Sequence, residues 1–326
     1  MHSEGIPFKE TGFFSRLIVD YLEQLPDLDP FYGRFPALEA FEGQMQEKGA
    51  SFPLAHRKVL CEVLSEQYAD LEISGTTREH LEKLEEATTF TVVTGHQLNL
   101  FTGPLYFVYK ILSTLKLSRV LKEHYPKHHF VPVYWMGTED HDFEEVNHFN
   151  FRGKEIRWNR ASGGAVGRMD TQGLEAVFEK FSADLGPGNR ADTLRRLFKQ
   201  AYLEHTNMAA ATRYLVNELF GHLGLVILDA DDARLKRLFT PQIENDLFGQ
   251  LGYRKVSGSI DRLNSLPGNY RIQVSPRELN FFYLEEGFRS RLVEEEGVFG
   301  VLDSDLRFSE EELREELQTH PERFSP

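Results

Sequence analysis

A polar loop at residues 94–104, with the sequence TGHQLNLFTGP, holds several side chains that could do chemistry. It offers His96, Gln97, Asn99 and Thr102 between Gly95 and Gly103, and an amphipathic pattern typical of a long helix follows it. The free N–H groups and the dipole at the start of a helix attract anions. A histidine there could donate to a phosphate or a carboxylate as negative charge builds in a transition state. The alternative is a loop whose polar side chains only cap the helix and satisfy each other.

A second polar segment, WMGTEDHDFEEVNH at residues 135–148, follows an apolar run. Its acidic side chains and histidines are Glu139, Asp140, His141, Asp142, Glu144, Glu145 and His148. Carboxylates beside a histidine can bind a divalent metal, hold a substrate ammonium or form a general base. An acidic first helical turn accounts for Glu144 and Glu145. It accounts poorly for Asp140, His141 and Asp142, which lie at the expected end of a strand.

The surrounding pattern predicts a β-α-β unit that brings both segments to one edge of a parallel sheet. Residues 90–94 and 130–136 are β-branched or apolar runs typical of buried strands. Between them, Gly103 and Pro104 open a helix that runs to about Tyr125, since proline suits the first helical turn. Parallel sheets carry their sites at the carboxyl ends of their strands. We therefore predict that the two loops meet there and form the active site.

The rest of the chain predicts an α/β fold with a helical start and an insertion. Helices are expected at residues 13–22, 54–71, 78–86, 191–204, 209–222, 235–248 and 310–319, the third with a capping box from Thr76 and Glu79 and the last capped by Ser309. A buried strand is expected at 224–229, and mostly strands from 252 to 303. The predicted domains are a helical segment at 1–88 that packs on the core, the first half of the core at 89–150, an inserted connecting element at 151–206, and the second half with a further β insertion at 207–326.

Composition and charge narrow the class of protein. With 326 residues, 40% of them hydrophobic, and a formal net charge of −14, the chain is an ordinary globular protein. It lacks the basic surface that duplex DNA requires. The single cysteine, Cys61, allows no internal disulfide and no cysteine-rich zinc site. Because neither a signal peptide nor a membrane-spanning run is found, we expect a cytoplasmic protein with no membrane and no nucleic-acid partner.

Three weaker features stay open. Asp229, Asp231 and Asp232 follow the strand at 224–229 and could reach the same site or cap the next helix. Arg277, in an ordinary turn, could bind an anion. The KVSGS segment starting at Lys255 faintly resembles the mobile Lys-Ser loop of class I synthetases, but a plain loop explains it better.

Two long motifs together resemble one enzyme family. TGHQLNLFTGPLY at residues 94–106 and VYWMGTEDHDFEEVNH at 133–148 are similar to those of the bacillithiol biosynthesis cysteine-adding enzymes, which are cysteine ligases. LDADD at 228–232, SPRELNFFY at 275–283 and HPERFSP at 320–326 agree with it. The resemblance implies a Rossmann-like core similar to class I synthetases and nucleotidyltransferases, inserted connecting elements, and a C-terminal coiled coil for dimerisation. The chain would stop before that coiled coil, so a homodimer is expected of a full-length chain.

The resemblance also implies a reaction and its ligands. L-cysteine would be joined by an amide bond to the amine of glucosaminyl malate, as the last step of bacillithiol biosynthesis. Activation of the cysteine carboxylate implies ATP, with magnesium as its companion. Residues 95–97 would stand where class I synthetases carry a His-x-Gly-His signature. No zinc is expected, since Cys61 is the only thiol.

The expected site residues follow from the two loops and from this resemblance. The catalytic candidates are His96, Asp140, His141 and Asp142. The substrate-binding candidates are Gln97, Asn99, Trp135, Glu139 and Asn147, and the nucleotide-binding candidates are Gly95, Thr102 and Gly103. Two rival functions remain: a metal-dependent hydrolase that uses Asp140, His141, Asp142 and His148, and a nucleotide- or metabolite-binding module without turnover.

Overall fold

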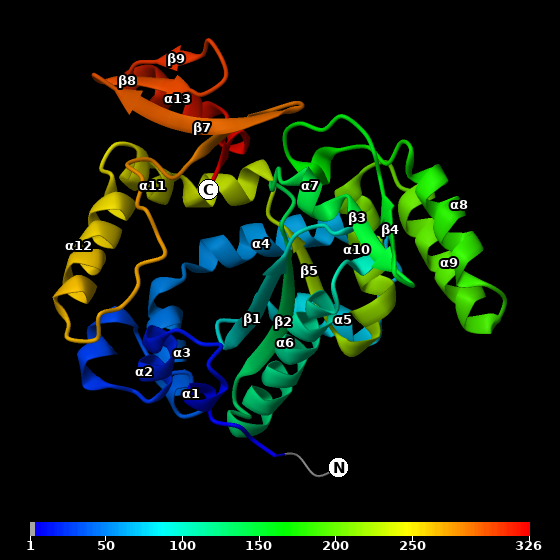
Figure 1. Ribbon diagram of the computed structural model, residues 1–326, viewed down its shortest axis with the longest axis horizontal. Helices are drawn as coiled ribbons and strands as arrows, with labels where there is room; N and C mark the ends of the chain where they lie inside the picture. The colour runs from blue at the N-terminus through cyan, green and yellow to red at the C-terminus, as the bar shows by residue number, and fades with distance from the viewer. Residues whose placement is uncertain (1–3) are drawn as a thin grey trace. The chain divides into compact units, whose positions relative to one another are not determined.

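The computed structural model, which describes residues 4–326, has two structural units (Figure 1). The larger unit holds residues 49–241 and 281–326. The smaller unit holds the residues up to Lys48 together with residues 242–280. Both polar loops belong to the larger unit.

The larger unit is built around a three-stranded parallel sheet. Its strands are β1 (Thr89–His96), β2 (His129–Met136) and β5 (Val226–Asp229), in the order β1-β2-β5. His96 of β1 lies in register with Met136 of β2, and Met136 with Asp229 of β5. All three strands therefore end at the same edge of the sheet, where the polar loops begin. The predicted α/β class with a parallel sheet is confirmed.

Helix α6 (Leu105–His124) connects β1 to β2, as the sequence predicts. It begins after Pro104, whose missing N–H costs nothing at a helix start. Phe107, Ile111 and Leu115 follow one another at intervals of about a helical turn, and each is at most 4% exposed. Burial of each such side chain contributes about 1.5–3 kcal/mol. The loop between β1 and α6 is thus held by two firmly packed elements.

The remaining elements of the larger unit cover this core and add a second sheet. Its other helices are α4 (Leu54–Gln67), α5 (Gly75–Lys83), α7 (Phe143–Val146), α8 (Leu174–Leu185), α9 (Asn189–Leu203), α10 (Met208–Phe220), most of α11 (Ala233–Leu247), and α13 (Glu310–Thr319), with short 3-10 turns η2 (Leu100–Thr102), η3 (Val166–Arg168), η4 (Gly221–Leu223) and η5 (Pro321–Arg323). Strands β3 (His148–Phe151) and β4 (Lys154–Arg157) form an antiparallel pair. The antiparallel second sheet has the order β10-β6-β7-β8-β9, from β6 (Phe282–Glu285), β7 (Phe288–Glu295), β8 (Val298–Val301), β9 (Arg307–Phe308) and β10 (Phe324–Ser325).

The smaller unit joins the start of the chain to a much later segment. It contains α1 (Phe8–Thr11), α2 (Arg16–Leu22), η1 (Pro26–Phe31), most of α3 (Ala40–Ser51), and α12 (Leu251–Ser265). The buried Asp20 accepts a hydrogen bond from the Tyr270 hydroxyl at 2.8 Å, across 250 positions of sequence. Arg16 Nε lies 3.3 Å from the same carboxylate oxygen.

Two sequence predictions for the later segment are wrong. The whole stretch from 252 to 265, expected to be mostly strand, belongs to helix α12 (Leu251–Ser265), and residues 270–274 form no strand. The apolar residues of α12 recur three or four positions apart, which is helical spacing: Tyr253, Val256, Ile260 and Leu263. Glycines and serines between them obscure that pattern in the sequence. The KVSGS segment therefore lies inside a helix and is not a loop.

The two predicted helix caps have different outcomes. Helix α5 is capped by Ser74, whose side chain accepts a hydrogen bond from the Thr77 N–H at 3.0 Å, so the expected Thr76–Glu79 capping box is wrong. Because Ser74 is the cap, the helix starts at Gly75, before Thr76. The cap of α13 is confirmed: Ser309 and Glu312 form a reciprocal capping box.

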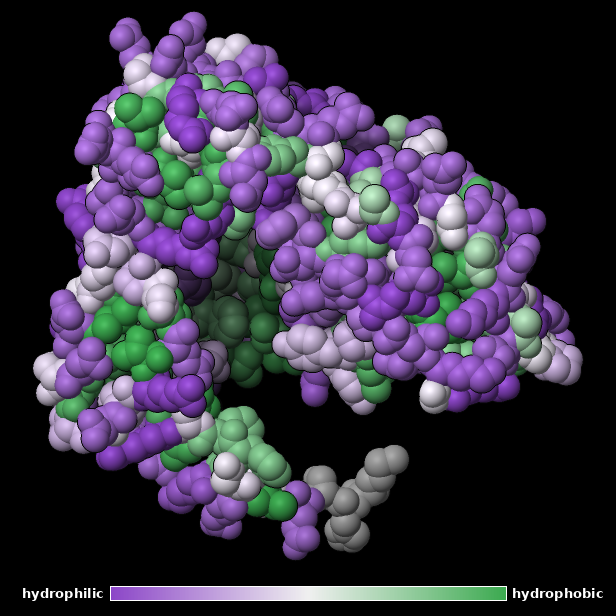
Figure 2. All heavy atoms as spheres, turned by 45° about the horizontal axis from the view of Figure 1, so that its top comes forward, coloured by the Kyte–Doolittle hydropathy of each residue, from purple (hydrophilic) through white to green (hydrophobic). Residues whose placement is uncertain are grey.

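Hydrophilic side chains cover most of the face shown in Figure 2, and hydrophobic ones gather there in separate patches. In the larger unit, exposed hydrophobic side chains include Val93 of β1, Trp135 of β2, and Tyr106 and Tyr109 of α6. Within residues 4–326, no helix combines the length and the apolar character needed to cross a bilayer.

Candidate active site

The two polar loops meet at the carboxyl end of the parallel sheet. The Gln97 side-chain amide donates to Asp140 Oδ2 at 2.7 Å and to Glu145 Oε2 at 3.0 Å. The Gly137 N–H donates to the His96 carbonyl oxygen at 2.9 Å. A Cβ atom at Gly137 would lie 3.0 Å from that same oxygen, so the backbones approach too closely for a larger residue to fit easily. The predicted contact between the loops is confirmed.

The loop between β1 and α6 holds an unusual backbone conformation. Gly103 has a φ of 57°, and a Cβ atom there would lie 2.4 Å from the Asn99 Cβ atom. Phe101 and Thr102 also have positive φ values, of 50° and 73°. A positive φ at a residue other than glycine costs of order 1–3 kcal/mol in stability, and it persists only where the surrounding packing enforces it.

The packing around Phe101 enforces this backbone conformation. Its ring contacts four other aromatic rings: Phe149, Phe181, Phe198 and Tyr202. The Phe101 N–H donates to the Tyr202 hydroxyl at 3.0 Å. Aromatic pairs contribute about 0.5–1.5 kcal/mol beyond their buried area, so the cluster offsets the strain of the loop. The neighbouring polar side chains are consequently held in fixed positions.

His96 lies half-buried at the tip of β1. Its Nδ1 lies 3.2 Å from the Gln97 carbonyl oxygen, and because a carbonyl can only accept, Nδ1 carries a proton. In the neutral ring, Nε2 then holds the free lone pair. Burial lowers the pKa of His96 below its usual value, and the nearby Lys110 cation lowers it further. The Lys110 ammonium itself donates to the Gly95 carbonyl oxygen.

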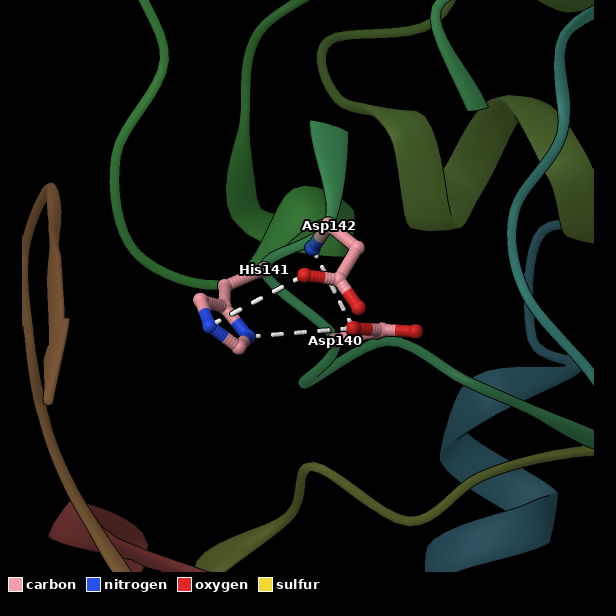
Figure 3. Close-up of side chains that lie close together, drawn as sticks. All are labelled: Asp140, His141 and Asp142. Carbon is pink, nitrogen blue, oxygen red and sulfur yellow. Dashed lines mark hydrogen bonds and ion pairs between the residues drawn. The ribbon is translucent and has the colours of Figure 1, made fainter. Parts of the chain in front are cut away.

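Asp140, His141 and Asp142 point toward one another in the second loop (Figure 3). Asp140 Oδ1 accepts a hydrogen bond from the Asp142 N–H at 3.2 Å. His141 Nδ1 lies 3.8 Å from Asp140, and Nε2 lies 3.9 Å from Asp142. One ligand atom from each residue lies within 4.8 Å of the others, so the three could share a cation. The hydrolase hypothesis also included His148, but this histidine is not part of the cluster. Its Nδ1 lies 3.0 Å from Asn147 Oδ1.

Glu139 belongs to a buried ionic network between the ends of β2 and β5. Lys236 Nζ of α11 lies 2.6 Å from Glu139 and 2.9 Å from Asp231, and only 7% of the Lys236 side chain is exposed. Arg168 donates two hydrogen bonds to Asp231, at 2.6 and 2.7 Å. Burial raises the pKa of Glu139 although Lys236 opposes the shift. Burial also acts to raise the pKa of Asp231, but hydrogen bonds from Arg168 and Lys236 prevail and hold it below its usual value.

The other predicted residues have varied surroundings. Trp135 is 45% exposed at the end of β2. The Asn99 amide lies 3.5 Å from the Glu145 carbonyl oxygen. Asn147 is buried, and its Oδ1 accepts from Arg157 at 2.9 Å. Thr102 is partly buried in the strained loop. The ligands of all these residues stay predictions.

The open features divide between the two units. Asp229 lies 3.4 Å from Arg213, and Asp232 accepts from the Arg234 backbone N–H at the start of α11, as a helix cap would. Asp231 alone joins the buried network beside the second loop. Arg277 belongs to the smaller unit.

Sequence reasoning missed two basic residues that contact Glu139 and His141 of the second loop. One is Lys236, whose position one helical turn after Asp232, at the start of α11, was the available signal. The other is Arg289 of β7, whose Nη1 lies 2.5 Å from His141 Nδ1 across 148 positions of sequence. No local pattern signals a contact over that separation.

A parallel sheet whose polar loops converge at the carboxyl ends of its strands defines a Rossmann-like α/β domain. The whole chain, residues 1–326, matches the family model described as "Bacillithiol biosynthesis BshC, N-terminal Rossmann-like domain". The chain belongs to this family, as its motifs predict.

Curated relatives agree with the family assignment. A Flavobacterium johnsoniae protein named "Putative cysteine ligase BshC" is 48% identical over 326 residues, which is 100% of this chain and 61% of the relative. Proteins of the same name from Flavobacterium psychrophilum and Christiangramia forsetii are 49% and 47% identical, again over 100% of this chain and 61% of their length. The chain thus spans about three fifths of the length of these relatives.

Proposed function

We propose that this chain carries the catalytic loops of a ligase that joins L-cysteine to glucosaminyl malate, the last step of bacillithiol biosynthesis. The observation that carries the proposal is the junction of the His96–Gln97 loop with the Asp140–His141–Asp142 loop, in a member of this family. Amide formation requires that the amine nitrogen bonds to the cysteine carbonyl carbon. A carboxylate oxygen must leave, and the amine must lose a proton.

The start of α6 is compatible with a nucleoside triphosphate. Its first residues, Leu105 and Tyr106, are exposed, and no side chain caps the helix at Pro104. Free N–H groups and the helix dipole therefore favour a phosphate there. Bound ATP would convert the cysteine carboxylate into an electrophile. His96 and the nucleotide-binding candidates Gly95, Thr102 and Gly103 border this place.

The second loop supplies the groups for the amine chemistry. The carboxylates of Asp140 and Asp142 are suited to hold the cysteine ammonium, to accept the proton of the attacking amine, or to bind the magnesium that accompanies ATP. Gln97, which bonds Asp140, would keep that carboxylate oriented toward the first loop. We place the protein in the cytoplasm, where both small-molecule substrates would be available. For the full-length protein we propose a homodimer.

Mass spectrometry of the product tests the proposal. This chain and the full-length Flavobacterium johnsoniae relative are each mixed with cysteine and glucosaminyl malate, with and without ATP and magnesium. We expect an ATP-dependent product that falls by roughly 10²-fold or more in His96→Ala, while His222→Ala, a change at an exposed histidine outside the loops, leaves it unchanged. Product from the relative alone would assign part of the site to the additional residues of the relative. No product from either protein would overturn the ligase.

One observation favours a second function. Because Asp140, His141 and Asp142 could share a cation, a metal-dependent hydrolase remains the alternative. It predicts ester or phosphoester hydrolysis that a chelator abolishes and added Mn²⁺ or Zn²⁺ restores. Hydrolysis that persists unchanged in chelator would exclude it.

A further inference from the structure

Arg289 is built into a fixed place beside the second loop. Its guanidinium carbon lies 3.8 Å from the centre of the Phe282 ring, and its Nη2 donates to Ser325 Oγ at 3.2 Å. Both partners belong to the same antiparallel sheet, Phe282 in β6 and Ser325 in β10. A guanidinium stacked on a ring and bonded at one end has little freedom to turn. Nη1 therefore meets His141 Nδ1 in a defined direction.

The chemistry of this contact restricts the imidazole. A guanidinium has five N–H donors and no acceptor, so His141 Nδ1 must accept the hydrogen bond at 2.5 Å. An accepting Nδ1 carries no proton, and the neutral ring then carries its proton on Nε2. That nitrogen faces Asp142, at 3.9 Å. The His141 ring also lies against Phe282, with 5.6 Å between ring centres.

The charges around Arg289 keep it cationic in this place. Burial lowers its pKa, but the carboxylates of Asp140, Glu139 and Asp142 act in the opposite direction. An arginine remains protonated throughout the range in which proteins work. The donor role of Arg289 is therefore permanent.

We propose that Arg289 is a positioning residue that fixes His141 as the Nε2–H tautomer, so that His141 presents a hydrogen-bond donor to the reacting groups. The inference rests on the proposed ligase function. It assigns different roles within the second loop: His141 donates a hydrogen bond, and a carboxylate receives the proton of the amine. Asp142 is the freer candidate for that step, because the Asp140 oxygens already accept from Gln97 and from the Asp142 N–H.

Nitrogen NMR of histidine-labelled protein tests the tautomer without turnover. The His141 signals are assigned by their loss in His141→Gln, and spectra are taken at about pH 8, where a typical histidine is neutral. We expect the Nδ1 shift of an unprotonated nitrogen and the Nε2 shift of a protonated one. Arg289→Met should give a mixture of tautomers, and Arg289→Lys, which keeps a cationic donor, should keep part of the preference. Arg307→Met is the matched control, since that arginine of the same sheet donates to the carbonyl oxygens of Ser304 and Leu306.

Kinetics of the full-length relative with the equivalent substitution give the second readout. Loss of positioning should lower kcat roughly 10- to 100-fold while KM for both substrates changes little. A tautomer that stays unchanged in Arg289→Met would overturn the proposal, as would unchanged kcat in an active ligase. A shifted tautomer in a protein without ligase activity would instead leave Arg289 as the positioning group and reject the ligase. If Arg289→Met does not fold, Phe282→Leu removes the ring under the guanidinium and should loosen the same tautomer.

Discussion

His96 combines a lowered pKa with a fixed Nδ1 proton. The lowered pKa favours the neutral ring, and the Nε2 of a neutral ring that carries its proton on Nδ1 can only accept. To donate to a phosphate, Nε2 must first gain a proton. A neutral ring therefore fits the proposed role only if nucleotide binding brings that proton with it.

This requirement gives a prediction about pH. A polyphosphate bound beside His96 would raise the pKa of this histidine, so that binding would take up a proton. The affinity for ATP should then increase as the pH falls from about 8 to about 5.5. Titration calorimetry at several pH values would measure the dissociation constant. His96→Gln should remove the part of the pH dependence that does not come from ATP itself. An identical pH profile in the two proteins would show that His96 does not meet the phosphates.

At the scale of the element, the conformation of the loop between β1 and α6 depends on Gly103. Gly103→Ala would force a Cβ atom into the Asn99 side chain at a backbone conformation that alanine rarely adopts. We expect a loss of about 1–3 kcal/mol in the free energy of unfolding, together with a shifted start of α6. Urea denaturation measures the loss. The control is Gly258→Ala in α12, where nothing lies within 4 Å, and there we expect a gain of up to about 1 kcal/mol. Equal effects at both positions would contradict the proposed strain.

The elements that sequence reasoning predicted best are those whose signals are local. The strands before and after α6 were predicted from their runs of apolar and β-branched residues. Helix α6 was predicted from the helical spacing of its apolar residues and from Gly103 and Pro104 at its start. The contact between the two loops followed from one rule about parallel sheets. Helix α12 was missed because small polar residues mask its apolar spacing. Arg289 was missed as a site residue because its contact depends on how distant segments pack, which no local pattern records. Lys236 was missed although it lies on the helix that follows Asp231 and Asp232, which was a local signal.

At the scale of the whole molecule, the smaller unit depends on a contact between segments far apart in sequence. Tyr270→Phe would remove the hydroxyl that bonds the buried Asp20 carboxylate. We expect a loss of about 1–3 kcal/mol, because the buried carboxylate loses the hydroxyl donor at 2.8 Å and keeps the longer contact with Arg16 Nε, at 3.3 Å. Hydrogen exchange would locate the effect, with faster exchange in α2 and unchanged exchange in β1 and β2. Tyr109→Phe, at an exposed position of α6, is the control. Uniform acceleration in both units would show that they do not respond separately.

The length of the relatives also matters for the whole molecule. The relatives extend well beyond the part that this chain matches. The loops described here supply a histidine, two aspartates and a helix start, and the proposed reaction must also bind two substrates and a nucleotide. A comparison of this chain with a full-length relative is therefore the decisive assay for the ligase.

The network of Lys236, Glu139, Asp231 and Arg168 has a consequence for how such proteins evolve. Lys236, Glu139 and Asp231 are largely buried, so the loss of any one of these three leaves an unbalanced buried charge, which costs roughly 3–5 kcal/mol. The Arg168 side chain is 37% exposed, so its loss costs less. Single substitutions at these positions should be rare among family members, and paired ones should be tolerated. A relative with an apolar residue at the position of Lys236 should also lack one of the two acids. The residues at the four positions would then change together between relatives, although they come from separate parts of the chain.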